Sequence, residues 1–203
     1  MSMFIKIVVF TYLALVSLSV VFSVEVDTGN EVCKISNLLL SNGTQNPNGA
    51  CVETFMGELP KSTNMISTVI LFPKDNNEIE ENQPFTIRTK SINLRTGFFT
   101  DPDNQYYIFP QTLDEQGFIQ GHSHVVIQEI NNEDEPLDPS VFAFFKGLDD
   151  PSNEQGELNA LVDNGLPVGK YRICTMVSSF AHQPALMPVA QRGILKIKLT
   201  VNF

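Results

Sequence analysis

The sequence predicts an all-β protein, a single antiparallel β-sandwich of about eight or nine strands with immunoglobulin-like or jelly-roll-like connections. Short apolar or alternating segments recur along the chain, and clusters of Asn, Asp, Pro and Gly separate them. The 12 prolines and 12 glycines fall at strand-like intervals. No segment carries the sustained apolar stripe of an amphipathic helix.

Each strand is expected where an apolar or alternating segment ends at turn-forming residues. Residues 85–94 place Phe85, Ile87 and Thr89 on one face. The segment "LPVGKYRIC" has the form of a turn entering a core strand of a sandwich. The alternation at 195–203 indicates a strand with one buried face. In chain order the predicted strands are 65–72, 85–94, 106–109, 124–130, 141–145, 157–162, a segment within 163–177, and 195–203.

Residues 1–23 have the form of a secretory signal peptide. Lys6 precedes an uncharged apolar stretch, and Val21 and Ser23 fit the small-residue positions before a cleavage site. The stretch is short for a membrane-spanning helix, and the alternating C-terminus lacks the apolar tail of a lipid-anchor signal. We therefore expect one secreted domain at 24–203, located in the extracellular space or the cell wall.

The charge of the chain limits its expected partners. It has 13 basic and 23 acidic residues, a formal net charge of −10. An acidic surface repels phosphate backbones and anionic lipids, so neither nucleic acid nor a membrane is an expected partner. A host protein and a cell-wall polysaccharide remain open. The absence of tryptophan counts against the polysaccharide, since sugar binding usually employs exposed aromatic side chains.

Three cysteines in an exported protein suggest one disulfide and one further thiol. Cys33 and Cys51 flank the turn-rich "SNGTQNPNGA", which can bring them together, and closing this loop would stabilise by about 3 kcal/mol in the chain-entropy model. Cys174 would then lie in a strand, although the other two pairings stay open. The sequon "NGT" makes Asn42 a candidate for N-glycosylation in a eukaryote.

Two of the three histidines, His122 and His124, stand one residue apart in "GFIQGHSHVVIQ". Residues two apart on a strand share a face, so Gln120 and both histidines are expected together on a mostly polar side, opposite a face of Ile and Val. This side is a candidate binding groove. His182 from "AHQP" and Arg192 are its further candidate members.

The same imidazoles are a candidate metal site. His122 and His124 can both reach one Zn²⁺ or Cu²⁺, and His182 can supply a third nitrogen. A water at the fourth position would give the site a catalytic form, with Gln120 or a carboxylate orienting that water. The alternative is that H-x-H is a common pattern whose histidines hydrogen-bond along a groove or lie in solvent, with no resident cofactor.

Other motifs give little support for catalysis. The sequence contains no G-x-S-x-G, no H-E-x-x-H and no phosphate-binding loop. Residues 100–105, "TDPDNQ", offer oxygen ligands but lack the central glycine and bidentate glutamate of an EF-hand, which favours a solvated turn. The acidic loops at 131–138 and 149–157 are also expected to be solvated. A non-catalytic protein is therefore the first hypothesis, and a metal-binding protein or metal-dependent enzyme is the alternative.

Four long segments occur together in the chain: "GFFTDPDNQYYIFPQTLDEQGFIQGHSHVVIQ", "FAFFKGLDDP", "GKYRICTM" and "HQPALMPVAQRG". Together they resemble a family of small secreted fungal proteins of unknown biochemical activity, some of which carry a ribosomal protein S17 label. The resemblance covers about Cys51 to Gly193. It implies an extracellular fungal protein that acts at the cell surface or a host interface, and it makes the histidine segments candidates for a shared site. It implies no reaction, because a fold and a family do not fix chemistry.

Overall fold

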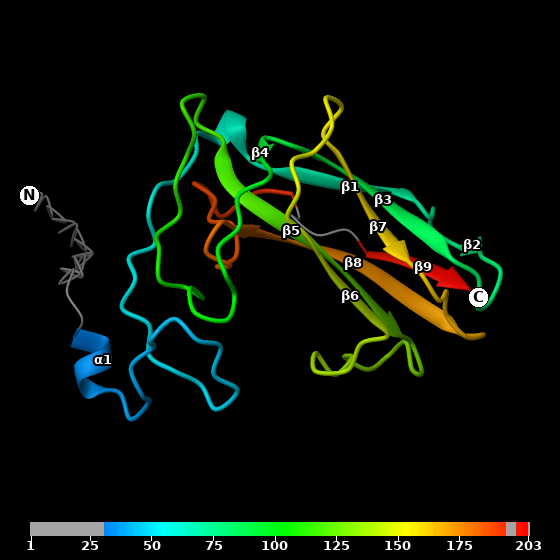
Figure 1. Cartoon of the computed structure of the whole chain (residues 1–203), viewed down its shortest axis with the longest axis horizontal. Helices are drawn as coiled ribbons and strands as arrows, with labels where there is room; N and C mark the ends of the chain where they lie inside the picture. The colour runs from blue at the N-terminus through cyan, green and yellow to red at the C-terminus, as the bar shows by residue number, and fades with distance from the viewer. Residues whose placement is uncertain (1–30, 194–197, 203) are drawn as a thin grey trace, which may run out of the picture.

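The computed structural model describes residues 31–193 and 198–202, and nearly all of its regular structure is β (Figure 1). The predicted signal peptide, residues 1–23, lies outside the described part of the chain. No helix among the described residues is long and apolar enough to cross a membrane. The elements are α1 (Glu31–Ile35), η1 (Ser62–Asn64), β1 (Ser67–Phe72), β2 (Asn77–Glu78), β3 (Phe85–Ile92), β4 (Leu94–Arg95), β5 (Ile119–Glu129), β6 (Phe144–Leu148), β7 (Glu157–Val162), β8 (Lys170–Ser179) and β9 (Lys198–Asn202).

The strands form two sheets (Figure 1). The smaller sheet is antiparallel, in the order β1-β3-β7, and the larger has the order β2-β9-β8-β5-β4, with β6 also paired to β5. The longest pairing is antiparallel and joins β5 to β8, from Gly121 opposite Ser179 to Glu129 opposite Tyr171. Two short strands pair in parallel, β2 with β9 and β4 with β5. These pairings make β5 and β8 the centre of the larger sheet.

The two sheets share one hydrophobic core, which confirms the predicted sandwich. Alternation along β3 buries Phe85 and Ile87, and alternation along β5 buries Val125 and Ile127, the last two with no exposed surface. Each such side chain contributes roughly 1.5–3 kcal/mol by leaving water. The buried members are Ile70, Phe85, Ile87, Val125, Ile127, Leu148, Leu158, Ala160, Val162, Leu166, Tyr171 and Ile173.

Two strand predictions were wrong in their position. Residues 106–109 form a turn, because Tyr107 has a left-handed backbone with φ of 61° that a strand does not accommodate. The strand expected at 141–145 is β6, which begins at Phe144. The Gln128 side chain binds the carbonyls of Asp138 and Val141, both at 2.9 Å, and so holds the approach to β6 as a loop.

Strand β5 also begins earlier than predicted, at Ile119 instead of residue 124. Gly121 permits this extension, because a Cβ atom there would lie 2.1 Å from the carbonyl oxygen of Ser178 on β8. The two backbones can therefore stay paired on both sides of His122. As a result His122 lies well inside the sheet and not at its edge.

Residues 31–60 form an arm along one end of the sandwich (Figure 1). The disulfide Cys33–Cys51, with a Cα–Cα distance of 5.6 Å, closes this arm and confirms the predicted pairing. Cys174 lies half-buried in β8. The N–H of Tyr106 donates to the carbonyl of Gly43 at 2.7 Å, so the arm is joined to the segment that precedes β5.

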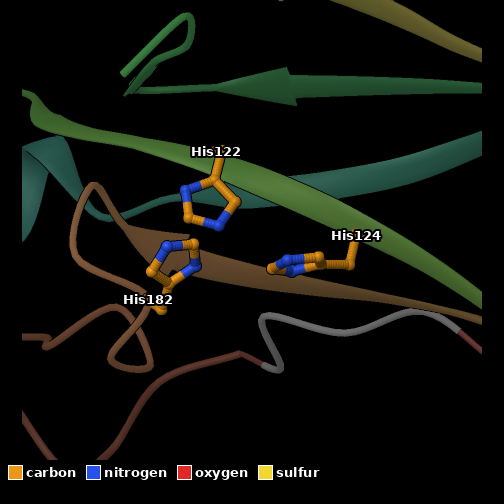
Figure 2. Close-up of side chains that lie close together, drawn as sticks. All are labelled: His122, His124 and His182. Atoms are coloured by element: carbon orange, nitrogen blue, oxygen red, sulfur yellow. The ribbon is translucent and has the colours of Figure 1, made fainter. Parts of the chain in front are cut away.

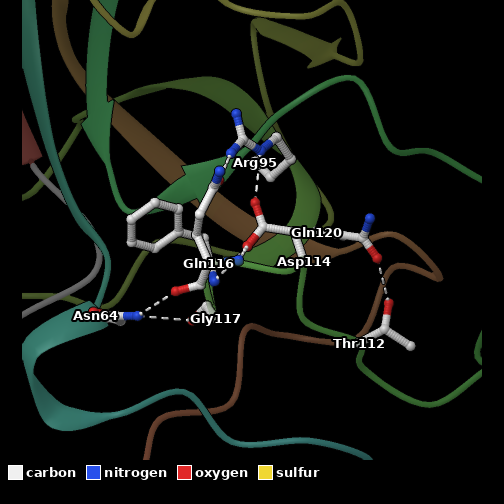
Figure 3. Close-up of polar contacts among 8 residues, drawn as sticks. Asn64, Arg95, Thr112, Asp114, Gln116, Gly117 and Gln120 are labelled. Carbon is white, nitrogen blue, oxygen red and sulfur yellow. Dashed lines mark hydrogen bonds and ion pairs between the residues drawn. The ribbon is translucent and has the colours of Figure 1, made fainter.

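A polar network fixes the turn that enters β5 (Figure 3). The Nε of Arg95 donates to the carboxylate of Asp114 at 2.7 Å, and its guanidinium also contacts the Gln116 side chain. Asn64 donates to two carbonyls of the same turn, both at 3.1 Å. Burial raises the pKa of Asp114, but the N–H of Phe118 and the Arg95 guanidinium outweigh it, and the net pKa is lowered.

Candidate functional site

His122, His124 and His182 lie together on the face of the larger sheet that points away from the core (Figure 2). The ring centroids of His122 and His124 are 4.7 Å apart, and those of His122 and His182 are 4.8 Å apart. One ligand nitrogen from each residue lies within 4.8 Å of the other two. The three histidines of the sequence therefore form one cluster.

The two-residue period of β5 places His122 and His124 on one face, as the sequence predicts. The alternative that these histidines lie in solvent is wrong at His122, whose side chain has no exposed surface. His124 is half-buried. The physical reason is that two loops cover this part of β5. The first loop is residues 98–107 and the second is residues 180–186.

These two loops stack on each other over the histidines. The N–H of Thr100 donates to the carbonyl of Phe180 at 2.9 Å, and the N–H of Tyr107 donates to the carbonyl of Ala181 at 3.0 Å. Phe99 from the first loop meets the rings of both His122 and His182 edge-on, at 4.9 Å between centroids. Phe99 thus excludes water from one side of the cluster.

His182 is held in place through its backbone and its ring. Its φ of 76° lies in the left-handed region, which is costly for a residue other than glycine and turns the side chain toward β5. Its Nε2 lies 2.8 Å from the carbonyl oxygen of Thr100. A carbonyl only accepts, so Nε2 carries a proton, and a metal would bind His182 through Nδ1.

Burial keeps the imidazole of His122 neutral. Desolvation, followed by the charges of His124 and His182, lowers the pKa of His122 to about 3. The nearby backbone of Phe98 opposes this shift, although it makes no hydrogen bond with the ring. Burial also lowers the pKa of His124, and the charge of His182 adds to this effect. Neutral imidazoles offer lone pairs and do not repel a cation.

The buried nitrogens of the cluster lack partners. Both ring nitrogens of His122 and the Nδ1 of His124 are inaccessible and make no hydrogen bond. A buried polar atom without a partner typically costs about 1–3 kcal/mol, so native proteins rarely retain one without a reason. A cation between the rings would give these lone pairs a partner.

The cluster fits a zinc or copper ion in the chemistry of its donors. Imidazole nitrogen is a preferred ligand of both metals, and three histidines with an open fourth position form a common zinc ligand set. Zinc–nitrogen bonds of about 2.0–2.1 Å in a tetrahedron place the nitrogens about 3.3 Å apart. The observed nitrogens lie within 4.8 Å of one another, so binding an ion would bring them closer together.

A cavity of about 530 Å³ opens beside His124 and His182. Phe99, Tyr106 and Phe145 line it, together with Gly147, which faces His124 across the β5–β6 pair. The sequence interpretation missed this aromatic wall. The signal that could have found it is the density of aromatic residues in "GFFTDPDNQYY" and "FAFF", close to the histidine segment.

Two other candidate binding residues lie apart from the residues that line this cavity. Gln120 accepts a hydrogen bond from Thr112 at 2.9 Å (Figure 3). Arg192 is exposed, and its guanidinium donates to the carbonyl of Val189 at 2.8 Å. Neither lines the cavity. Residues 100–105 form a turn in which the Asp101 carboxylate accepts the N–H of Asp103 at 2.9 Å, as expected of a solvated turn.

Comparison with known proteins relates this chain to a fungal protein. A family model described as the CLU5d N-terminal domain matches residues 68–202, a range that includes all three histidines. The chain is 45% identical over 171 residues to "Pathogenicity cluster 5 protein d" of Colletotrichum graminicola, an alignment that covers 83% of this chain and 36% of the relative. The chain thus matches little more than a third of that protein's length.

Proposed function

We propose that this chain, which belongs to the fungal CLU5d N-terminal domain family, is a secreted protein whose His122, His124 and His182 bind one zinc or copper ion. One observation carries the proposal. Three imidazoles converge within 4.8 Å, and the innermost has both ring nitrogens buried without a partner. A buried histidine with a purely structural role would instead be expected to make a hydrogen bond through at least one ring nitrogen.

The three ligands have different roles in this proposal. His122 is the buried ligand, and Phe99 keeps water from its ring. His182 is the oriented ligand, since the Thr100 carbonyl fixes its tautomer. His124 is the third ligand, and because both it and His182 line the cavity, the open coordination position would face that space. A bound ion would supply a Lewis acid at this position.

Elemental analysis of protein purified without an affinity tag tests the metal site. We expect about one zinc or copper per chain, reduced at least about tenfold by His124→Ala. Val126→Ala is the matched control, because Val126 lies two residues further along the same face of β5 and offers no ligand. Protein that holds no stoichiometric zinc or copper after incubation with either ion contradicts the proposal.

Secretion is supported by three features that do not depend on the metal. The Cys33–Cys51 disulfide suits an oxidising compartment, and the relative's name links it to pathogenicity. Asn42 is exposed, and its side chain accepts hydrogen bonds from the N–H and hydroxyl of Thr44, at 3.1 and 2.7 Å. Expression with the native N-terminus in a filamentous fungus should deliver the protein to the medium, and Asn42→Gln should remove its glycan. Retention inside the cell would refute secretion.

A metal-free binding protein is the second candidate, and the cavity beside the histidines favours it. Its partner would be a host protein or a cell-wall polysaccharide. Tyr106 and Tyr107 stack on each other at 4.1 Å between centroids, which offers an aromatic surface for a sugar ring. Retention on chitin or β-glucan by protein that holds no metal would support this candidate.

A further inference from the structure

We infer that the cavity beside the histidines binds a flat aromatic molecule that carries a single carboxylate, whose oxygen takes the open position of the metal. The inference rests on the proposed function, because it needs the ion in place. It adds the chemical class of the ligand. The cavity volume of about 530 Å³ suits a substituted aromatic ring.

The walls of the cavity are aromatic next to the candidate ligands. Phe145 lies 5.2 Å from His124 between ring centroids, and Tyr106 lies 5.5 Å from His182 in a stacked arrangement. Phe99 and Phe145 keep 39% and 46% of their surface exposed, so their rings are available to a ligand. Stacked and edge-on contacts with such rings favour a flat aromatic ligand.

The lack of charged side chains on the walls favours a ligand with a single negative group. No lysine, arginine, aspartate or glutamate is among the described residues that line the cavity. The metal would therefore be the main positive centre, with three imidazoles around it. One carboxylate partly neutralises a divalent ion, whereas a phosphate or a polyacid would find no side-chain cation.

Gly147 leaves the cavity open at His124. A Cβ atom at Gly147 would lie 3.8 Å from the Cδ2 of His124, which is an ordinary contact distance. The residue is in strand β6 and is not among those with a left-handed backbone, so a larger side chain is compatible with its conformation. A leucine at this position would extend into the cavity without replacing a ligand.

Calorimetric titration of the zinc-loaded full chain with benzoate tests the inference. We expect benzoate to bind at least about tenfold more tightly than acetate or cyclohexanecarboxylate, and to lose that affinity when zinc is removed. Gly147→Leu should keep one zinc per chain and weaken benzoate at least about tenfold. Gly193→Leu is the matched control, because no atom lies within 4 Å of a Cβ built there.

The outcomes separate the two proposals. Zinc binding with benzoate no tighter than acetate overturns this inference and leaves the metal site standing. Equal benzoate affinity with and without zinc overturns the metal–oxygen contact. Failure to bind either zinc or copper overturns the proposed function and this inference with it. If Gly147→Leu loses zinc, Phe145→Ala replaces it as the variant, and unchanged benzoate affinity in Phe145→Ala overturns the aromatic wall.

Discussion

The imidazoles of His122 and His182 meet edge to face at 4.8 Å between centroids, although one lies in the middle of β5 and the other in the loop after β8. Two interactions set this relationship. Backbone hydrogen bonds join the two covering loops, and the Thr100 carbonyl contacts the ring of His182. The cluster is therefore organised by the fold before any ion binds. Such preorganisation lowers the entropic cost of binding.

Chelator-treated protein is expected to lose stability as the pH falls below about 6.5. The pKa of His122 is lowered from 6.5 to about 3 in the folded state, so between these values the unfolded chain binds the extra proton. The free energy of unfolding therefore decreases with falling pH, by up to about 1.4 kcal/mol per unit, and His122 adds no slope above this window. The lowered pKa of His124 acts with the same sign.

Urea denaturation at about pH 7.5, 6 and 5 measures this slope while most carboxylates stay ionised. His122→Leu should show a shallower dependence, since its side chain takes up no proton. Equal slopes in the two proteins would contradict the assignment.

The backbone at His182 makes a separate prediction. Its φ of 76° favours glycine, so His182→Gly should be more stable than His182→Ala by about 1 kcal/mol, even though both lack the imidazole. Thermal and chemical denaturation of the two variants measure the difference, with chelator present to remove any effect of metal. An alanine variant as stable as the glycine variant would show that the backbone at residue 182 adopts another conformation once the histidine is replaced.

The sequence predicted the sandwich well where alternation is strict and turn residues bound it. Strand β7 occupies the predicted residues 157–162, and β3 covers most of 85–94. The prediction at 106–109 was wrong because adjacent aromatic residues mimic a buried strand. In the structure Tyr106 and Tyr107 lie in a turn and line the cavity. Apolar residues predict burial, but they do not show which part of the protein they will pack against.

The site was predicted only as far as local periodicity reaches. The shared face of His122 and His124 follows from a two-residue period, which any strand obeys. The burial of His122 depends on loops that meet through Thr100 and Phe180, far apart in the chain, and no local pattern encodes such a contact. The same limit explains why Phe99 was not recognised as a cover.

Gln111 provides a test of how the arm is held. Its fully buried side chain donates to the carbonyls of Glu58 and Leu186, at 2.7 and 3.2 Å, and accepts the N–H of Leu186 at 2.8 Å. Gln111→Leu leaves these backbone groups without partners and should cost about 2–4 kcal/mol. Limited proteolysis should then cut within residues 31–60. Gln155→Leu, at an exposed position, should change stability by less than about 0.5 kcal/mol.

His122→Leu distinguishes the destabilisation caused by the empty metal site from the stabilisation provided by a bound ion. Without metal the variant replaces a buried, unpartnered imidazole by an apolar side chain of similar volume, so its stability at pH 7 should match or exceed that of the parent. Zinc at about 100 times its dissociation constant should stabilise the parent by about 2.7 kcal/mol and the variant by much less. Thermal denaturation with and without zinc measures both quantities. A variant that is strongly destabilised without metal and still responds fully to zinc would mean that His122 is a packing residue, since its ring would then contribute to the core and not to the ion.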